Sequence, residues 1–240
     1  MINKIKDLIR ENRENQQQLI RQNQELEWAH VYHDSIRGKV HLENLPLNIG
    51  RWAGNYAFFY LLNRIMSDAK PQRILEFGLG ESSKFITVCL EQELKSGFHH
   101  IIEQSSEWAT AFNSRFELSA YSKVSVCPLV KKQINGHEVN SYEGLAEEVS
   151  GIFDLYLVDG PFGSPHFSRY DILAVAERLK PSDEFIIVID DYDRIGEQET
   201  AKALEVLFEE KQIKAYTKVY TGIKKVWLLA TPKYRFVTSI

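Results

Sequence analysis

The sequence predicts an α/β protein built on a doubly wound, mostly parallel sheet of seven strands, with an antiparallel hairpin at its C-terminal end. Three observations predict this fold. From Pro71 onward, short apolar runs alternate with helical patterns, as in parallel strands joined by crossover helices. The last two β-rich runs are separated only by Thr221-Gly222-Ile223, which suits a hairpin that adds an antiparallel edge. A long segment without glycine or proline precedes the alternating region and predicts a helical extension.

Length and composition fit one large domain with an appendage. The 240 residues are 44% hydrophobic and 26% charged, close to the averages for soluble globular proteins. A net charge of −4 and the lack of a Lys/Arg cluster argue against a nucleic-acid partner. Cys89 and Cys127 are too few for a disulfide framework or a zinc site. No apolar run approaches the roughly 20 residues of a membrane span, and the N-terminus leads into no signal peptide. We therefore expect a cytoplasmic protein.

The N-terminal segment, residues 1–37, is predicted to be a polar helix with a narrow apolar stripe, as in a short coiled coil. Its heptad seam consists of Ile2, Ile5, Ile9, Asn12, Gln16, Leu19, Asn23 and Leu26. A lone helix this polar is marginal in water, so we expect a homo-oligomer formed through it. The alternatives are a solvated helix folded back onto its own domain and a frayed tail. Residues 38–70 are predicted to form a linker and an amphipathic helix, and residues 71–240 the main domain.

The main domain contains five candidate strands and the terminal hairpin. The expected strands are 73–77, 99–103, 123–127, 153–158 and 184–189, and the expected helices are 81–95, 105–118, 165–180 and 197–211. The hairpin pairs residues 213–220 with 224–230. Between Val130 and Tyr142, Asn135-Gly136 marks either a loop or a short hairpin.

Glycines and an acid stand at the ends of the first two strands. In open parallel sheets, ligands bind beyond the carboxyl ends of the strands. The first strand leads into Gly78-Leu79-Gly80, where the backbone turns tightly and lets a ligand approach. The second strand ends at Glu103, and an acid there is able to accept both hydroxyls of a ribose. Two glycines alone also serve ordinary strand-to-helix turns, but together with Glu103 they favour an adenosine-type ligand.

The segment Glu76-Phe77-Gly78-Leu79-Gly80-Glu81-Ser82 resembles motif I of class I S-adenosylmethionine-dependent methyltransferases, E/D-x-G-x-G, with Ser82 replacing the commonly found third glycine. The resemblance runs from Pro71 to Pro232 and includes Glu103, Asp159-Gly160-Pro161 and the closing hairpin. It implies a Rossmann-like fold. Within that superfamily, the sequence is most similar to the glucuronoxylan 4-O-methyltransferase group and to bacterial methyltransferase-like proteins of polysaccharide clusters. A nicotinamide fingerprint would have glycine at Ser83 instead.

The resemblance implies a role for each motif residue. Gly78 and Gly80 would lie beneath the methionine part of S-adenosylmethionine, with Ser82 beside them, and Glu103 would hold the ribose hydroxyls. Glu76 would meet the amino-acid end of the cofactor, directly or through water. The plain alternative for Glu76 is a strand-end carboxylate bonded to neighbouring backbone N–H groups. The third strand ends at Val126-Cys127-Pro128 without the usual adenine-binding acid, so no adenine pocket is assigned.

Three carboxylates follow the fourth and fifth strands. Asp159 ends the fourth strand, and Asp190 and Asp191 end the fifth. If they converge, they would repel one another unless a cation joins them, and Mg²⁺ or a similar divalent ion suits such oxygen ligands. The arrangement resembles the metal site of catechol-type O-methyltransferases, with Asp191 standing where those enzymes have Asn. Alternatively, Asp190 and Asp191 cap the next helix and Asp159 shapes the Gly-Pro turn.

The loop after Asp159 contains two further candidates. His166 would be a general base, since its reference pKa near 6.5 suits proton abstraction at neutral pH; a surface or capping role is the plain alternative. Arg169 would pair with an acidic acceptor such as a uronate or phosphate, and a structural salt bridge is equally compatible with the sequence. Arg51 and Trp52 would close over the cofactor, or Trp52 would simply pack in the core.

These features favour an O-methyltransferase that transfers a methyl group from S-adenosylmethionine to a hydroxyl of a sugar, a glycan or a glycan precursor, with divalent-metal assistance as one option. The carbohydrate acceptor is implied by the family resemblance alone. A second hypothesis is a non-catalytic scaffold of the same fold that assembles partners through its N-terminal helix. A third is an NAD-dependent oxidoreductase, which Ser83 and the acids after the fourth and fifth strands disfavour.

Overall fold

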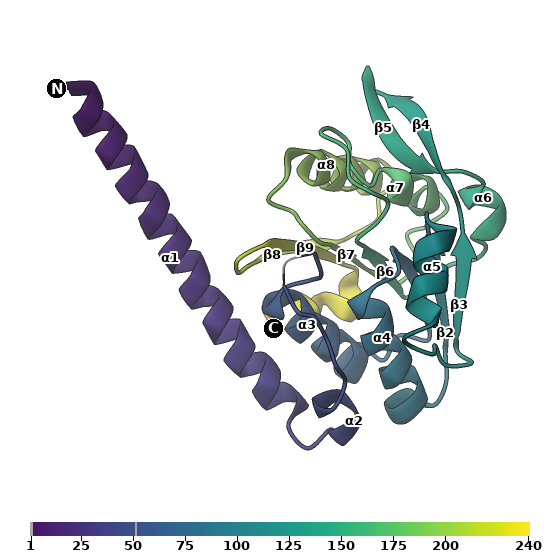
Figure 1. Cartoon of the computed structure of the whole chain (residues 1–240). Coiled ribbons are helices and arrows are strands. Elements are labelled where there is room, and N and C mark those ends of the chain that lie inside the picture. The colour runs from purple at the N-terminus through teal and green to yellow at the C-terminus, as the bar shows by residue number, and fades with distance from the viewer. Residues whose placement is uncertain (1, 51) are drawn as a thin grey trace.

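The computed structural model describes residues 2–50 and 52–240, and it confirms the long N-terminal helix. This helix, α1 (Ile2–Ile36), extends away from the domain at its N-terminal end, and its C-terminal part lies beside α3 (Tyr56–Arg64) (Figure 1). Tyr32 and Ile36 are buried in the hydrophobic cluster that covers α3, and Trp28 packs against it. Apolar burial therefore fixes only the second half of α1 to the domain.

Glu25 holds α1 in place by polar contacts. Its carboxylate accepts hydrogen bonds from Asn55 Nδ2 and from the backbone N–H of Tyr56, both at 2.7 Å, and from the N–H of Ile223 at 2.9 Å. A Cβ on Gly222 would overlap this carboxylate, so a side chain at that position of the hairpin turn would displace Glu25 from its contacts. Three chain segments that are remote in sequence thus meet at one acid.

The central sheet has seven strands, as the sequence predicts. Its strands are β1 (Arg73–Phe77), β2 (Phe98–Glu103), β3 (Ser122–Val126), β6 (Leu155–Val158), β7 (Ile186–Ile189), β8 (Tyr216–Thr221) and β9 (Lys225–Ala230). They lie in the order β3-β2-β1-β6-β7-β9-β8. The first five are parallel, and β9 is antiparallel to both of its neighbours. The chain order reverses beside β1, where ligands bind in sheets of this kind.

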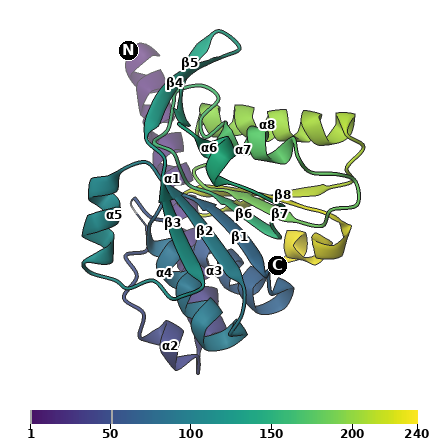
Figure 2. The same cartoon turned by 90° about the vertical axis from the view of Figure 1, so that its right-hand side faces the viewer.

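Helices cover both faces of the sheet. The remaining helices are α2 (Val40–Glu43), η1 (Ile65–Ala69), α4 (Glu81–Val88), η2 (Cys89–Leu94), α5 (Ser106–Asn113), α6 (Leu145–Glu148), α7 (Asp171–Ala176), α8 (Ile195–Glu210) and η3 (Pro232–Ser239). Figure 2 shows α3 and α4 on one face and α7 and α8 on the other. Successive residues of β1 belong to different faces of the sheet: Ile74 lies in the hydrophobic cluster on one face and Leu75 in the cluster on the other. Burial on both faces explains why the central strands β6 and β7 are continuous apolar runs.

Two segments differ from the simplest expectation. The helix expected over 165–180 is reduced to α7, because Phe167 and Arg169 have φ angles of +45° and +58°, which a right-handed helix cannot include. The Asn135-Gly136 segment is the turn of a hairpin, β4 (Leu129–Ile134) with β5 (His137–Tyr142). Both turn residues have positive φ, as two-residue hairpin turns require.

Within the described part of the chain, no helix combines the length and the apolar character needed to cross a lipid bilayer.

Candidate active site

The ends of β1 and β6 lie in close contact and form the floor of the candidate site. A Cβ on Gly78, whose φ is +99°, would lie 3.3 Å from the backbone of Asp159. A Cβ on Gly160 would lie 2.8 Å from the Gly78 nitrogen and would overlap the Tyr142 hydroxyl. Both glycines are therefore required by the close approach of two backbones. This contact places the motif after β1 directly beside Asp159.

Gly80 has a different environment. A Cβ built on it would meet nothing within 4 Å, and its φ of −164° is one that any residue adopts. The protein itself therefore gives no packing reason for glycine at the start of α4. The space above Gly80, at the N-terminus of α4, is open. A ligand that approaches this backbone would explain the missing side chain.

Glu103 lies at the end of β2, against the same loop. Its Oε2 accepts the N–H of Leu79 at 2.9 Å, and its Oε1 accepts the N–H groups of Gln104 and Ser105, each at 2.8 Å. The residue is only 6% exposed. A carboxylate has about four acceptor positions, so one remains for a ligand. The bidentate ribose contact expected from the sequence would require one backbone bond to be released.

Glu76 is placed differently from the expectation. The residue is fully buried. One carboxylate oxygen accepts the Ser82 hydroxyl, and the other lies 2.8 Å from His99 Nε2. Direct contact with a cofactor is therefore not available to Glu76, and its partners are side chains rather than the backbone N–H groups of the plain alternative. Its carboxylate instead fixes Ser82, and with it the first turn of α4.

The buried network around Glu76 extends through His99 to two hydroxyl side chains. His99 Nδ1 lies 3.1 Å from Ser122 Oγ, which in turn lies 2.7 Å from Thr87 Oγ1. His99 is completely buried inside β2. No local pattern in the sequence indicates that Glu76 is its partner.

The three strand-end aspartates converge as expected. Ligand oxygens of Asp159, Asp190 and Asp191 all lie within 4.8 Å of one another. The Asp159 side chain is 23% exposed and is the most accessible of the three, while Asp190 is fully buried. Burial, reinforced by the other two aspartates, raises the pKa of Asp159 to about 7 although Arg169 opposes the shift. The reachable carboxylate of the cluster is therefore Asp159.

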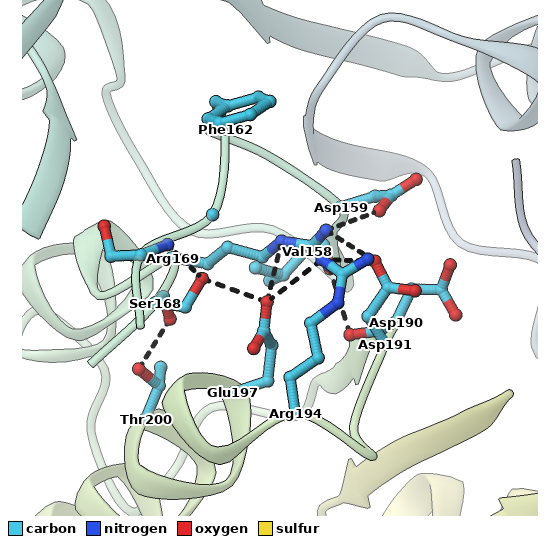
Figure 3. A network of polar contacts seen from close by, with 12 residues as sticks. Val158, Asp159, Phe162, Ser168, Arg169, Asp190, Asp191, Arg194, Glu197 and Thr200 are labelled. Atoms are coloured by element: carbon cyan, nitrogen blue, oxygen red, sulfur yellow. Dashed lines mark hydrogen bonds and ion pairs between the residues drawn. The ribbon is translucent and has the colours of Figure 1, made fainter. Parts of the chain in front are cut away.

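Arg169 lies inside this cluster, as Figure 3 shows. Its Nη2 is 3.0 Å from Asp159 Oδ1 and 2.9 Å from Asp191 Oδ2. The residue is 4% exposed, so its guanidinium is not free to pair with an acidic acceptor. These ion pairs are the structural salt bridge that the sequence left open as the alternative to an acceptor-binding role. The physical reason is that buried carboxylates need a counter-charge.

Lys224 is the second cation of the cluster. Its Nζ lies 3.0 Å from Asp191 Oδ1 and 3.7 Å from Asp190 Oδ2. Burial alone would raise the pKa of Asp191, but Arg169 and Lys224 outweigh it and lower that pKa. No pattern in the sequence distinguishes Lys224 from its neighbour Lys225.

A divalent cation does not fit this donor set as it is arranged. An ion on the three aspartates would share its ligands with the guanidinium of Arg169 and the ammonium of Lys224, which already lie about 3 Å from Asp191. Two fixed positive charges beside the ion oppose its binding. The helix-capping alternative for Asp190 and Asp191 is not observed either, since the residue before α8 is Arg194, whose side chain makes no capping bond.

The remaining residues predicted from the sequence either lie apart from the aspartates or fall outside the residues that the structure describes. His166 Nδ1 is 2.9 Å from Glu199 Oε1 on α8, and its ring stacks on His137 at 4.1 Å between centroids. These contacts tie His166 to α8 and the β4–β5 hairpin rather than to the aspartates. Trp52 is 92% exposed and so is not a core residue, whereas Arg51 lies outside the described residues.

Comparisons with known proteins support the fold. No protein-family model matches this sequence, and no curated protein sequence matches it. Among solved structures, an O-methyltransferase from Bacillus cereus in complex with SAH is similar with a TM-score of 0.51, at 16% identity, over 84% of this chain and 90% of that chain. The O-methyltransferase TomG from Streptomyces achromogenes, involved in tomaymycin synthesis and in complex with SAM, is similar with a TM-score of 0.50, at 16% identity, over 85% and 88% of the two chains. The chain thus has the Rossmann-like fold of the class I methyltransferases.

Proposed function

We propose that this protein transfers a methyl group from S-adenosylmethionine to a hydroxyl oxygen of a sugar, a glycan or a glycan precursor. The observation that carries the proposal is the open space above Gly80, at the strand ends where Glu103 and Asp159 also lie. A glycine without a packing reason at a helix N-terminus is what a bound carboxylate or phosphate group would require. The fold and the motif after β1 favour the methionine carboxylate of S-adenosylmethionine.

The proposed roles follow the positions of the residues. Gly78 lets the ends of β1 and β6 approach each other, Gly80 leaves room for the cofactor, and the last acceptor position of Glu103 takes a ribose hydroxyl. Glu76 and Ser82 hold the first turn of α4 in position. The sugar acceptor would lie on the exposed side of Asp159, under the loop that continues to Arg169. The carbohydrate class itself comes from the sequence resemblance.

The chemistry is an in-line displacement. The hydroxyl oxygen attacks the methyl carbon, the carbon–sulfur bond breaks, and sulfur keeps the electron pair, which leaves S-adenosylhomocysteine. Asp159 accepts the hydroxyl proton as the oxygen–carbon bond forms. Arg169 keeps the Asp159 carboxylate oriented, and positioning of both reactants supplies the rest of the rate enhancement. Divalent-metal assistance is not part of this proposal, because Arg169 and Lys224 already compensate the aspartates.

Calorimetric titration tests the donor class. We expect S-adenosylhomocysteine to bind with one site per chain and NAD not to bind; binding of NAD alone would overturn the proposal. An acceptor screen with labelled S-adenosylmethionine, with and without a chelator, then tests the reaction. Tight cofactor binding with no methylated sugar or glycan product would favour the non-catalytic scaffold instead.

We also infer that the chain self-associates through α1. The seam residues Ile5, Ile9, Leu19 and Leu26 are between 48% and 60% exposed, so the apolar stripe faces away from the domain. A second copy of the same stripe would bury it. Light scattering should give a multiple of the chain mass, and the double variant Ile9→Asp, Leu19→Asp should give the mass of one chain. An unchanged mass in the variant would exclude this helix as the cause.

A further inference from the structure

The carboxylates at the ends of β6 and β7 carry their own cations. We propose that Arg169 and Lys224 are built-in counter-ions that take the place of a divalent metal among Asp159, Asp190 and Asp191, and that they exclude such an ion from the cluster. They would be positioning residues, since they act through the aspartates rather than on a substrate. This inference concerns the cluster itself and does not depend on the nature of the acceptor.

Arg169 bridges two of the three carboxylates. Its Nη2 bonds Asp159 and Asp191, and its Nη1 donates to the backbone carbonyl of Asp190 at 3.1 Å. One guanidinium therefore touches all three aspartates. The left-handed φ of +58° at Arg169 turns the side chain into the cluster, where a residue of a regular helix would not reach. Figure 3 shows the guanidinium between Asp159 and Asp191.

Lys224 approaches from the turn of the C-terminal hairpin, which lies beside the end of β7. It stands directly before β9, and its ammonium contacts Asp190 and Asp191 while donating to the carbonyl of Ala53 at 3.0 Å. Burial alone would lower the pKa of Lys224, but Asp190 and Asp191 outweigh it and raise that pKa. Lys224 therefore stays charged. Its fixed contact with Ala53 leaves it little freedom to withdraw.

Asp190 shows why Lys224 matters. Asp190 is fully buried, and neither of its carboxylate oxygens has a hydrogen-bond partner among the described residues. The ammonium of Lys224, at 3.7 Å, is the cation paired with that carboxylate. A buried carboxylate without compensation is strongly unfavourable. If Lys224 lost its charge, Asp190 would have to take up a proton or bind another cation, and a divalent ion is one such cation.

The charge of the wider cluster leads to the same conclusion. Four carboxylates, those of Asp159, Asp190, Asp191 and Glu197, face three cations, Arg169, Arg194 and Lys224. With all four carboxylates ionised, the residual charge is a single negative one. Adding a divalent ion would reverse its sign in a buried site, which is costly at low dielectric. A cluster without Lys224 would instead carry two negative charges and match a divalent ion.

Binding of Mn²⁺, followed by electron paramagnetic resonance and calorimetry, tests this inference without any assay of methyl transfer. We expect the wild-type protein not to bind one Mn²⁺ per chain at concentrations up to about 1 mM. A Kd above about 1 mM corresponds to a binding free energy weaker than about 4 kcal/mol. The variant Lys224→Gln should bind one Mn²⁺ per chain at least tenfold more tightly than wild type. The matched control Lys225→Gln, at a residue without an ion pair in the described structure, should behave as wild type.

Two outcomes would overturn the inference. The first is one Mn²⁺ per wild-type chain at micromolar concentration, lost in Asp190→Asn, which would make the cluster a metal site. The second is no gain of Mn²⁺ binding in folded Lys224→Gln. If Lys224→Gln does not fold, Arg169→Gln provides the same readout, and Lys224→Arg should fold and remain free of Mn²⁺.

Discussion

The backbone N–H of Leu79 donates a 2.9 Å hydrogen bond to Oε2 of Glu103. This bond joins the glycine-containing loop after β1 to the end of β2. Because the other oxygen of the same carboxylate accepts two more backbone N–H groups, Glu103 organises the edge of the site before any ligand binds. Its substitution should therefore affect both the stability of the protein and its affinity for a cofactor.

Replacing Glu103 with alanine removes an acceptor from three backbone donors. We expect the free energy of unfolding to fall by about 2–3 kcal/mol and the affinity for S-adenosylhomocysteine to fall by about 1.5–3 kcal/mol, the range for hydrogen bonds to a charged group. Denaturant unfolding and calorimetry measure the two effects. Glu107→Ala, at an exposed position of α5, is the control and should change neither. Unchanged affinity in Glu103→Ala would remove Glu103 from the cofactor site.

Gly80 offers a variant whose effects on folding and on binding should separate. Since a Cβ at this position meets no atom within 4 Å, Gly80→Ala should leave the unfolding free energy within about 0.5 kcal/mol of wild type. The added methyl group would occupy the space proposed for the cofactor, so we expect at least a tenfold loss of S-adenosylhomocysteine affinity by calorimetry. Wild-type affinity in a stably folded Gly80→Ala would show that nothing binds closely there.

Asp159→Asn keeps the volume of the side chain but removes its charge. We expect methyl transfer to fall by about 100-fold or more, the usual contribution of a positioned base, while S-adenosylhomocysteine still binds. Rate measurements with labelled donor and circular dichroism distinguish loss of chemistry from loss of fold. Glu143→Gln changes an exposed acid elsewhere and should retain full activity. A fully active Asp159→Asn would end the proposed base role.

Glu25→Gln should loosen α1 from the domain. The neutral side chain cannot accept all three hydrogen bonds made by Asn55, Tyr56 and Ile223, and we expect a stability loss of about 1–3 kcal/mol. Amide hydrogen exchange should accelerate in α1 and in the turn before β9. Glu27→Gln lies on the exposed side of the same helix and is the matched control. Equal exchange in the two variants would contradict the role assigned to Glu25.

The pH dependence of stability should contain a contribution from His100. Burial, with a further effect of Lys123, lowers the pKa of His100 from 6.5 to about 4. The unfolded chain therefore takes up a proton at higher pH than the folded protein, so stability is lost as the pH falls from about 6.5 toward 4 and levels off below. The full effect is on the order of 3 kcal/mol.

Denaturant unfolding at several pH values measures this contribution. In His100→Gln the slope of stability against pH between 6.5 and 4 should decrease, because the titrating group is gone. His30→Gln, at an exposed position of α1, should keep the wild-type slope. Identical slopes in wild type and His100→Gln would show that the imidazole is not responsible.

Local patterns in the sequence determined the architecture. Alternating apolar runs and helical segments fixed β1, β2, β3, β6 and β7 to within one or two residues. The two β-rich runs between Ile213 and Ala230 correctly predicted the antiparallel pair β8 and β9 at the edge of the sheet. These predictions succeeded because strands such as β6 and β7 are buried on both faces and so are continuous apolar runs, while the helices between them have one apolar face. The sequence also predicted that Glu103 and Asp159 lie at the same edge of the sheet, because the carboxyl ends of parallel strands lie on the same side.

The partners of each charged side chain were decided only by the tertiary structure. Arg169 was expected to bind an acceptor, yet it lies among Asp159 and Asp191. Lys224, 33 positions beyond Asp191, was not singled out at all, and Glu76 pairs with His99 rather than with a ligand. Ion pairs form between residues brought together by sheet order and loop conformation, and neither leaves a periodic trace in the sequence. A carboxylate at a strand end can therefore be predicted from sequence, but whether a metal, a ligand or a basic side chain neutralises it cannot.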